Sequence, residues 1–198
     1  MLWDVLQKLL LPIWPTDRTS IDGVALGDAW PLKLLQGEGQ KLDETTTIQP
    51  FHKLTQWLTY SLMVPFTRQL KLTWTNTNFL TGLPEYRNGG LFVDKGVLTL
   101  KPKELERGLA SAGAANGLPI FSPSDDVVVE WRAMTVILLD VLYEMILARL
   151  RKDKPDVYLS MAQVLESGTW KAGREVAAEL RPLTKSSPLL IDSDGTVF

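Results

Sequence analysis

Residues 127–151 read VVVEWRAMTVILLDVLYEMILARLR, a stretch that would be apolar on nearly every side of a helix. The preceding residues 122–126, SPSDD, are typical of a helix start, because carboxylates in the first turn interact favourably with the helix dipole. Charged residues interrupt the stretch, among them Glu130, Arg132, Asp140 and Glu144. A membrane span is therefore a poor interpretation, and the pattern predicts the central hydrophobic helix of the domain.

Shorter segments with helical periodicity surround this helix along the chain. We expect helices over residues 1–11, 51–63 (ending near Pro65), 102–110 and 161–180. A further short helix should begin with Asn88 as its N-cap and end near Lys95. These segments predict a mainly α fold class, a multi-helix domain that spans residues 1–198.

Two regions between the predicted helices indicate irregular or extended chain. Residues 12–50 are punctuated by proline and glycine, and Trp14 and Trp30 within them are expected to be buried anchors. Residues 73–81 are polar and β-branched, which predicts a short strand and turn. The domain should therefore hold few short strands.

The composition argues against several classes of function. The chain has 198 residues and a net charge of −2, so it lacks the basic excess with which nucleic-acid-binding proteins neutralise phosphates. It has no cysteine, which removes disulfides and thiolate chemistry and fits a cytoplasmic protein. His52 is the only histidine, so a multi-histidine metal site cannot form, and we expect neither a metal nor a cofactor. Asp4 and Lys8 interrupt the apolar residues 1–11, which argues against a signal peptide.

The predicted helix over residues 51–63 has two stripes at helical spacing. The first, which should face the core, consists of Leu54, Leu58, Ser61 and Leu62. The second combines a cation, an amide and two aromatic rings, on Lys53, Gln56, Trp57 and Tyr60. This second stripe predicts either a solvated face with aromatic residues or the wall of a pocket for a phosphorylated or cyclic ligand.

Two charged residues lie on apolar faces of the central helix. Glu130 shares a stripe with Ala133, Met134, Ile137 and Val141, so a buried carboxylate there must be paired or have a raised pKa. Arg132 lies across the helix and faces the same constraint. A buried glutamate–arginine pair that joins helices is the structural interpretation, and a functional site is the alternative.

The segment 84–90, PEYRNGG, lies just before the predicted short helix. Backbone N–H groups at a helix start favour an anion, and Arg87 can hold one through two hydrogen bonds. An ordinary capped turn is the structural alternative.

Five segments of the sequence resemble a known family. They are PFHKLTQWLTYSL (50–62), TGLPEYRNGG (81–90), VEWRAMT (129–135), ESGTWKAGR (166–174) and SDGTVF (193–198). In this order they resemble the uracil catabolism protein 4 family of fungi and bacteria, formerly described as a domain of unknown function, over essentially the whole chain. Members of that family carry a further N-terminal helical region. The resemblance therefore implies that this chain corresponds to the C-terminal part of a longer fold.

A more distant likeness connects the chain to queuosine-5′-phosphate N-glycosylases, which are helical proteins related in fold to DNA glycosylases. The positions that match their pattern are Lys53, Gln56, Glu85, Tyr86, Arg87, Glu130 and Arg132. The glycosylase pattern has aspartate where Glu85 stands, lacks the continuation 88–90, and has a C-terminal aromatic–acidic segment without a counterpart here. The identity of the substrate therefore does not carry over.

Together the resemblances imply a role in uracil breakdown, as a hydrolase of the N-glycosidic bond of ribosylurea or its 5′-phosphate. Glu85 or Glu130 would be the catalytic carboxylate, in the way that carboxyl groups serve glycoside hydrolysis. Lys53 and Arg87 would hold phosphate or ribose. The remaining substrate-binding candidates are Gln56, Trp57, Tyr86, Asn88 and Arg132.

A non-catalytic binding or scaffold subunit of the same pathway is the alternative, with a small molecule or a partner enzyme as its ligand. An open pocket faced by Glu85 and Glu130 would favour the enzyme. Closed ion pairs at Glu130 and Arg132 would favour the subunit. The sequence leaves the oligomeric state open.

Overall fold

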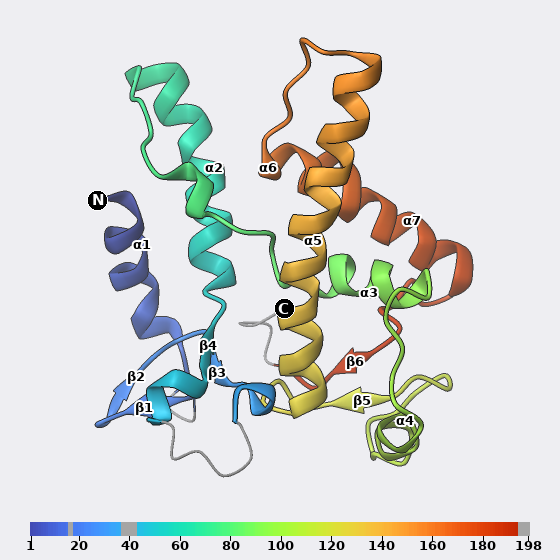
Figure 1. Cartoon of the computed structure of the whole chain (residues 1–198). Helices are drawn as coiled ribbons and strands as arrows, with labels where there is room; N and C mark the ends of the chain where they lie inside the picture. The colour runs from blue at the N-terminus through green and yellow to red at the C-terminus, as the bar shows by residue number, and fades with distance from the viewer. Residues whose placement is uncertain (16–17, 37–42, 194–198) are drawn as a thin grey trace.

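The computed structural model describes residues 1–15, 18–36 and 43–193, so the end of the last family motif lies outside the described chain. Helices dominate the molecule, and the predicted mainly α fold class is confirmed (Figure 1). Helix α5 runs through the middle, with α1 and α2 on one side and α3 and α7 on the other. The helices are α1 (Leu2–Leu10), α2 (Lys53–Leu70), α3 (Tyr86–Asp94), α4 (Pro102–Leu109), α5 (Asp126–Asp153), α6 (Met161–Val164) and α7 (Trp170–Leu180).

Within the described residues, three two-stranded sheets lie around the lower part of the helices in the view of Figure 1. Two are antiparallel, β1 (Ser20–Ile21) with β2 (Val24–Ala25) and β3 (Ala29–Pro31) with β4 (Ile48–Pro50). The third is parallel and pairs β5 (Ile120–Phe121) with β6 (Leu190–Ile191). Because each sheet has two short strands, the fold depends on helix packing.

Helix α5 is the central element, as its sequence predicts. The Asp125 side chain caps its start by accepting a 3.0 Å hydrogen bond from the Val127 N–H. The helix contributes to three groups of buried apolar side chains. Val129 packs with Trp14, Trp30, Leu32 and Phe51; Leu139 with Leu83, Phe92 and Leu165; and Val128 and Trp131 with Phe121 and Leu189. The predicted burial of Trp14 and Trp30 is thereby confirmed.

Helix α2 differs from its prediction in length and in its buried face. It continues through Pro65 to Leu70, because Pro65 lies on the exposed side, where the carbonyl group that loses its partner meets solvent. Of the stripe expected to face the core, Leu54 packs against the buried group around Trp30 and Phe51, as predicted. Leu58 and Leu62 are only half-buried and Ser61 is exposed, so for Ser61 the expectation was wrong. The buried side chains are polar, namely Lys53, Thr55, Gln56 and Thr59.

The segment after α2 also departs from its prediction. In place of a strand, residues 73–81 hold a single 3-10 turn, Thr77–Phe79. The Trp74 indole N–H donates to the Met63 carbonyl group at 3.3 Å and to Thr67 Oγ1 at 2.8 Å. These two hydrogen bonds hold the segment against α2. No strand of the described chain pairs with the segment there, so it forms no sheet.

The start of α3 is capped by Glu85, whereas the sequence pattern favoured Asn88. Glu85 accepts the N–H of Asn88, and Asn88 lies inside the helix with its side chain directed into the protein interior. Two glycines allow close helix contacts here. A Cβ on Gly89 would lie 2.7 Å from atoms of Trp131 and Thr135, and a Cβ on Gly173 would meet the Arg87 carbonyl oxygen.

The predicted helix over residues 161–180 is interrupted by one π-helical turn. Helix α6 leads directly into this turn, Leu165–Thr169, and α7 follows without a break. The turn places the Thr169 hydroxyl group 2.8 Å from Asn88 Oδ1, to which it donates. The turn therefore joins the C-terminal helices to α3.

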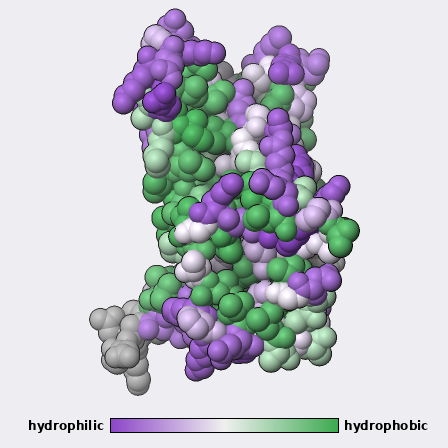
Figure 2. Space-filling view, turned by 90° about the vertical axis from the view of Figure 1, so that its right-hand side faces the viewer, coloured by the Kyte–Doolittle hydropathy of each residue, from purple (hydrophilic) through white to green (hydrophobic). Residues whose placement is uncertain are grey.

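Large apolar side chains are exposed on two of the long helices. On α1, Val5 and Leu9 are 60% and 65% exposed, and on α5 the stripe Ile137, Val141 and Met145 is 54%, 51% and 63% exposed. Figure 2, which views the molecule from the side of α3 and α7, shows hydrophobic residues gathered in a band bounded by hydrophilic residues at the top. None of the helices within the described ranges combines the length and apolarity that a bilayer span requires.

Candidate active site

Four ionisable side chains from four separate segments meet in the protein interior. They are Asp28 before β3, Lys53 at the first position of α2, Glu85 at the cap of α3, and Arg132 in the second turn of α5, and we call them the charge cluster. Their residues are 0%, 8%, 5% and 1% exposed, respectively. Charged residues are rarely buried without partners, so each of these four side chains should have a group that stabilises its charge or a shifted pKa.

Asp28 and Arg132 form a closed ion pair. Arg132 donates from Nη1 and Nη2 to the two Asp28 carboxylate oxygens, each at 2.7 Å, and from Nε to the Pro84 carbonyl group at 3.3 Å. Its guanidinium group also lies 4.2 Å from the centre of the Phe51 ring. The predicted glutamate–arginine pair was thus wrong in its carboxylate partner, which is Asp28, 104 residues away in the sequence.

Asp28 is held in its charged form by this environment. Burial alone would raise the pKa of Asp28, but the Arg132 charge and its hydrogen bonds keep that pKa below its usual value. The Lys53 backbone N–H donates to Asp28 Oδ2 at 3.0 Å, and the Trp30 indole N–H donates to Oδ1 at 2.8 Å. Asp28 therefore fixes both the start of α2 and the position of Arg132.

Lys53 and Glu85 have pKa values displaced in opposite directions. Burial, with the nearby Arg132 charge, lowers the pKa of Lys53 to about 8, although Glu85 and Asp28 oppose the shift. Burial raises the pKa of Glu85, against hydrogen bonds from the Arg87 and Asn88 backbones and the charge of Lys53. The pKa values of an amine and a carboxyl group are thus moved toward each other, a property of acid–base sites.

Two predicted ligand-binding residues, Gln56 and Asn88, have their side-chain amides occupied by the protein. Gln56 donates from Nε2 to Thr81 Oγ1 at 2.8 Å and accepts the Thr81 N–H at 2.9 Å. Asn88 donates to the Leu83 carbonyl group at 3.1 Å and accepts from the Thr169 hydroxyl group at 2.8 Å. Both amides hold the walls of the charge cluster in place.

The other residues predicted from the short helix and from α2 lie nearer the surface. Arg87 stacks over the half-buried Tyr86 ring, with 4.9 Å from the guanidinium carbon to the ring centre. Trp57, one turn after Lys53, is 44% exposed. Tyr86 and Arg87 line a small surface hollow with Gly173 and Pro188, and its described lining includes none of the four charge-cluster residues.

Glu130 lies apart from the charge cluster. It is half-buried and lines a separate cavity of about 260 Å³, whose wall includes Trp131, Met134 and Lys101 but none of the charge-cluster residues. The expectation that its stripe belongs to the core was wrong, because Ile137 and Val141 on the same stripe are exposed. Its carboxylate is therefore not forced into a buried pair.

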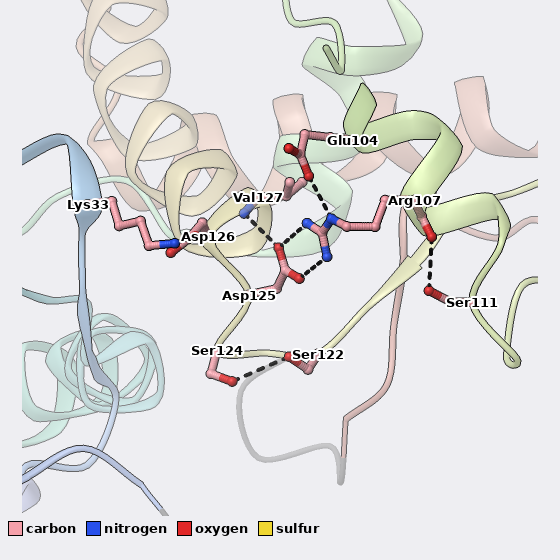
Figure 3. A network of polar contacts seen from close by, with 9 residues as sticks. All are labelled: Lys33, Glu104, Arg107, Ser111, Ser122, Ser124, Asp125, Asp126 and Val127. Carbon is pink, nitrogen blue, oxygen red and sulfur yellow. Dashed lines mark hydrogen bonds and ion pairs between the residues drawn. The ribbon is translucent and has the colours of Figure 1, made fainter. Parts of the chain in front are cut away.

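A polar network borders the Glu130 cavity (Figure 3). Arg107 on α4 donates to both Asp125 carboxylate oxygens, at 2.6 and 2.8 Å, and to Glu104 at 2.7 Å. Lys33 forms an ion pair with Asp126. These contacts link α4 and the segment after β3 to the start of α5, so they have a structural role of their own.

Sequence patterns did not reveal Asp28 or Thr169 as parts of the site. Asp28 lies in irregular chain with no periodic neighbours, and Thr169 lies in a helix whose π-turn no pattern predicts. Within the described chain, no three side chains of His, Cys, Asp or Glu converge on a position that could hold a metal ion.

The fold and the charge cluster together define a helical protein with buried acid and base groups beside its central helix. The chain belongs to the family described as "Protein of unknown function (DUF1688)", whose model matches residues 1–198.

Two curated relatives show how this chain compares with other members. It is 53% identical over 197 residues to "Protein urg3" of Schizosaccharomyces pombe (strain 972 / ATCC 24843). The aligned region covers 100% of this chain and 44% of that relative. It is 48% identical over 204 residues to "Uracil catabolism protein 4" of Lachancea kluyveri, and this aligned region covers 99% of this chain and 45% of that relative. The chain thus spans less than half the length of these relatives. No solved structure matches it.

Proposed function

We propose that this chain takes part in uracil catabolism and carries the acid–base site for hydrolysis of a ribosylurea-type N-glycoside, with or without a 5′-phosphate. The pathway is inferred from the relative named uracil catabolism protein 4. The observation that carries the reaction is that a buried carboxyl group of raised pKa, Glu85, lies within electrostatic reach of a buried amine of lowered pKa, Lys53.

In the proposed reaction, protonated Glu85 donates its proton to the leaving urea nitrogen as the bond from that nitrogen to the sugar C1′ breaks. Water then bonds to C1′, and the proton that it loses returns to the Glu85 carboxylate. The products are urea and the free sugar. Lys53 and Arg87 hold the phosphate or hydroxyl groups, and Trp57 covers the sugar.

Glu130 has no assigned step in this proposed reaction, because it lines a different cavity. We also propose that this chain corresponds to one part of the longer family fold and that further polypeptide covers the apolar stripes of α1 and α5 in the relatives. The exposed apolar residues of α1 and α5 support this proposal, since a monomer seldom exposes such stripes.

The test compares this chain with the full-length Schizosaccharomyces pombe relative. Each is incubated with ribosylurea 5′-phosphate, and released urea is measured. In whichever protein is active, replacing the glutamate equivalent to Glu85 by Gln should lower the rate by about 10²–10⁴-fold, the range for loss of a general acid. The matched control is Glu106→Gln, which changes an exposed glutamate on α4. Absence of urea from both wild-type proteins, or an equal rate in Glu85→Gln, contradicts the proposal.

A non-catalytic binding subunit is the second candidate, and the closed contacts of the cluster favour it. Arg132 is committed to Asp28, and the Glu85 carboxylate caps α3. In that case Glu85→Gln should lower the melting temperature, neither protein should release urea, and equilibrium dialysis should still detect bound ribosylurea 5′-phosphate.

A further inference from the structure

The only histidine of the chain lies outside the charge cluster, and its hydrogen bonds fix where its proton resides. The Thr55 hydroxyl group donates to Gln7 Oε1 at 2.7 Å, and Gln7 Nε2 lies 3.1 Å from His52 Nδ1. Because the Gln7 oxygen accepts from Thr55, its amino group donates to His52. Nδ1 is therefore the acceptor, and the neutral ring carries its proton on Nε2.

The backbone holds His52 in a conformation that few side chains adopt. Its φ is 45°, in the left-handed region, and the N–H groups of Phe51 and His52 both donate to the Asp28 carbonyl group, at 2.9 and 3.0 Å. Such strain persists where the surrounding structure maintains it, and it is concentrated at functional sites. The Trp3 ring makes an edge contact with the imidazole, 6.4 Å between ring centres.

His52 lines a surface hollow of about 410 Å³ between α1, the β1–β2 hairpin and β4. The walls are mostly apolar and include Leu11, Leu26 and Ile48. The described lining residues include no Lys, Arg, Asp or Glu. The described lining offers a charged ligand no counter-ion in return for the hydration that it would lose, so these residues favour a neutral ligand.

The Nε2–H group of His52 has no hydrogen-bond partner among the described residues. Nδ1 is engaged by Gln7, and the described residues make no hydrogen bond to Nε2. Burial lowers the pKa of His52, which keeps the ring neutral and the Nε2–H in place at neutral pH. A ligand in the hollow can therefore complete the chain of hydrogen bonds that begins at Thr55.

We infer that this hollow is a binding site for a small neutral molecule with an amide- or urea-type carbonyl group and an apolar body. The carbonyl oxygen accepts the His52 Nε2–H bond, and the apolar part contacts the walls. This site lies beyond the proposed glycoside hydrolysis, because none of its lining residues belongs to the charge cluster.

The first test is long-range ¹H–¹⁵N NMR of the intact chain at pH 7, in which a single histidine gives a single imidazole signal set. The expected spectrum is that of the neutral Nε2–H tautomer. Phenylurea, as a neutral probe, should then shift Nε2 and the methyl signals of Leu11, Leu26 and Ile48. Phenylacetate has the same ring with a charge and should leave them unchanged.

Two variants test the contacts. His52→Asn tolerates the left-handed backbone and should bind phenylurea about three- to tenfold more weakly, the loss expected for one hydrogen bond. Gln7→Met should populate the Nδ1–H tautomer and weaken binding to a similar extent. Lys8→Gln, an exposed change beside Gln7, is the control and should match wild type.

Three results would overturn the inference. They are an Nδ1–H tautomer in the wild-type chain, phenylurea shifts that miss the hollow, and equal affinity in His52→Asn. The first two measurements need no variant, so they decide the question even if a substitution prevents folding.

Discussion

At the scale of single residues, Lys53 and Glu85 owe their displaced pKa values chiefly to burial. The Arg132 charge adds to the shift of Lys53, whereas the charges of Glu85 and Asp28 oppose it. Asp28 and Arg132, beside them, are matched by two hydrogen bonds to each other. The same interior thus contains one closed ion pair, together with an amine and a carboxyl group whose pKa values are moved toward each other. This difference leads to separate predictions for the two pairs.

The free energy of unfolding should rise with pH between about 8 and 10. In that window unfolded Lys53, with an ordinary pKa of 10.5, still binds its proton, whereas folded Lys53, with a pKa of about 8, has lost it. More protons are bound at Lys53 in the unfolded state, so its contribution to stability increases, by about 2 kcal/mol over the window. The raised pKa values of Tyr60 and Tyr143 act in the opposite direction near pH 10, so the contribution of Lys53 is the difference between wild type and Lys53→Met. Urea titrations at several pH values should show this rise in wild type and in the exposed control Lys8→Met. A rise of equal size in Lys53→Met would contradict the assignment.

The Asp28–Arg132 pair should behave as one unit in a double-mutant cycle. Removing one partner leaves a buried charge unmatched, so Asp28→Asn or Arg132→Met alone should lower the free energy of unfolding by about 3–5 kcal/mol. The double variant should lose less than the sum of the two. Lys171→Met, which breaks an exposed ion pair to Glu175, should stay within about 0.5 kcal/mol. Additive losses at Asp28 and Arg132 would show that the pair is not coupled.

Sequence patterns identified one half of this pair and missed the other. Arg132 stood out because a charge on an apolar helix needs a partner. Asp28 did not, since its segment has no helical or strand period and its partner lies 104 residues away. A single sequence records which residues are costly to bury, but the partner is set by the packing of segments that are distant in the chain.

At the scale of elements, the contact of α3 with α5 depends on the small size of Gly89. A Cβ there would lie 2.7 Å from Trp131 and Thr135 atoms, so Gly89→Ala should destabilise the protein by about 1–3 kcal/mol. Gly168→Ala is a matched control, because its Cβ would meet only Val164 at 4.0 Å and alanine favours helix. Urea midpoints measure both changes. Equal effects would show that the helix contact can relax.

Helix existence was predicted better than helix ends. The pattern located all of the long helices, because apolar periodicity reports burial over several turns. It assigned the cap of α3 to Asn88, yet Glu85 caps it, since both residue types can cap and the interior contacts of Asn88 decide between them. It also ended α2 near Pro65, although an exposed proline can remain within a helix.

At the scale of the whole molecule, the exposed stripe on α5 should be dispensable for the stability of this chain. Val141 and Met145 are 51% and 63% exposed, so Val141→Lys and Met145→Lys together should change the free energy of unfolding by less than about 1 kcal/mol. The same pair should reduce the fluorescence of the hydrophobic dye ANS, because it interrupts the apolar stripe. A large loss of stability, or unchanged dye fluorescence, would show that the stripe is covered by the chain itself.

The π-helical turn at Leu165–Thr169 has a consequence for family members of different length. Such a turn contains one residue more than the α-helix that it replaces, and each residue of an α-helix turns the chain by about 100°. Deleting one residue here would make α6 and α7 one continuous α-helix. The side chains on one side of the deletion would then rotate about the helix axis by about 100° relative to those on the other side. Thr169 would then lose its hydrogen bond to Asn88 on α3. A one-residue gap at this point in a homologue would therefore indicate that its α3 is held by different contacts.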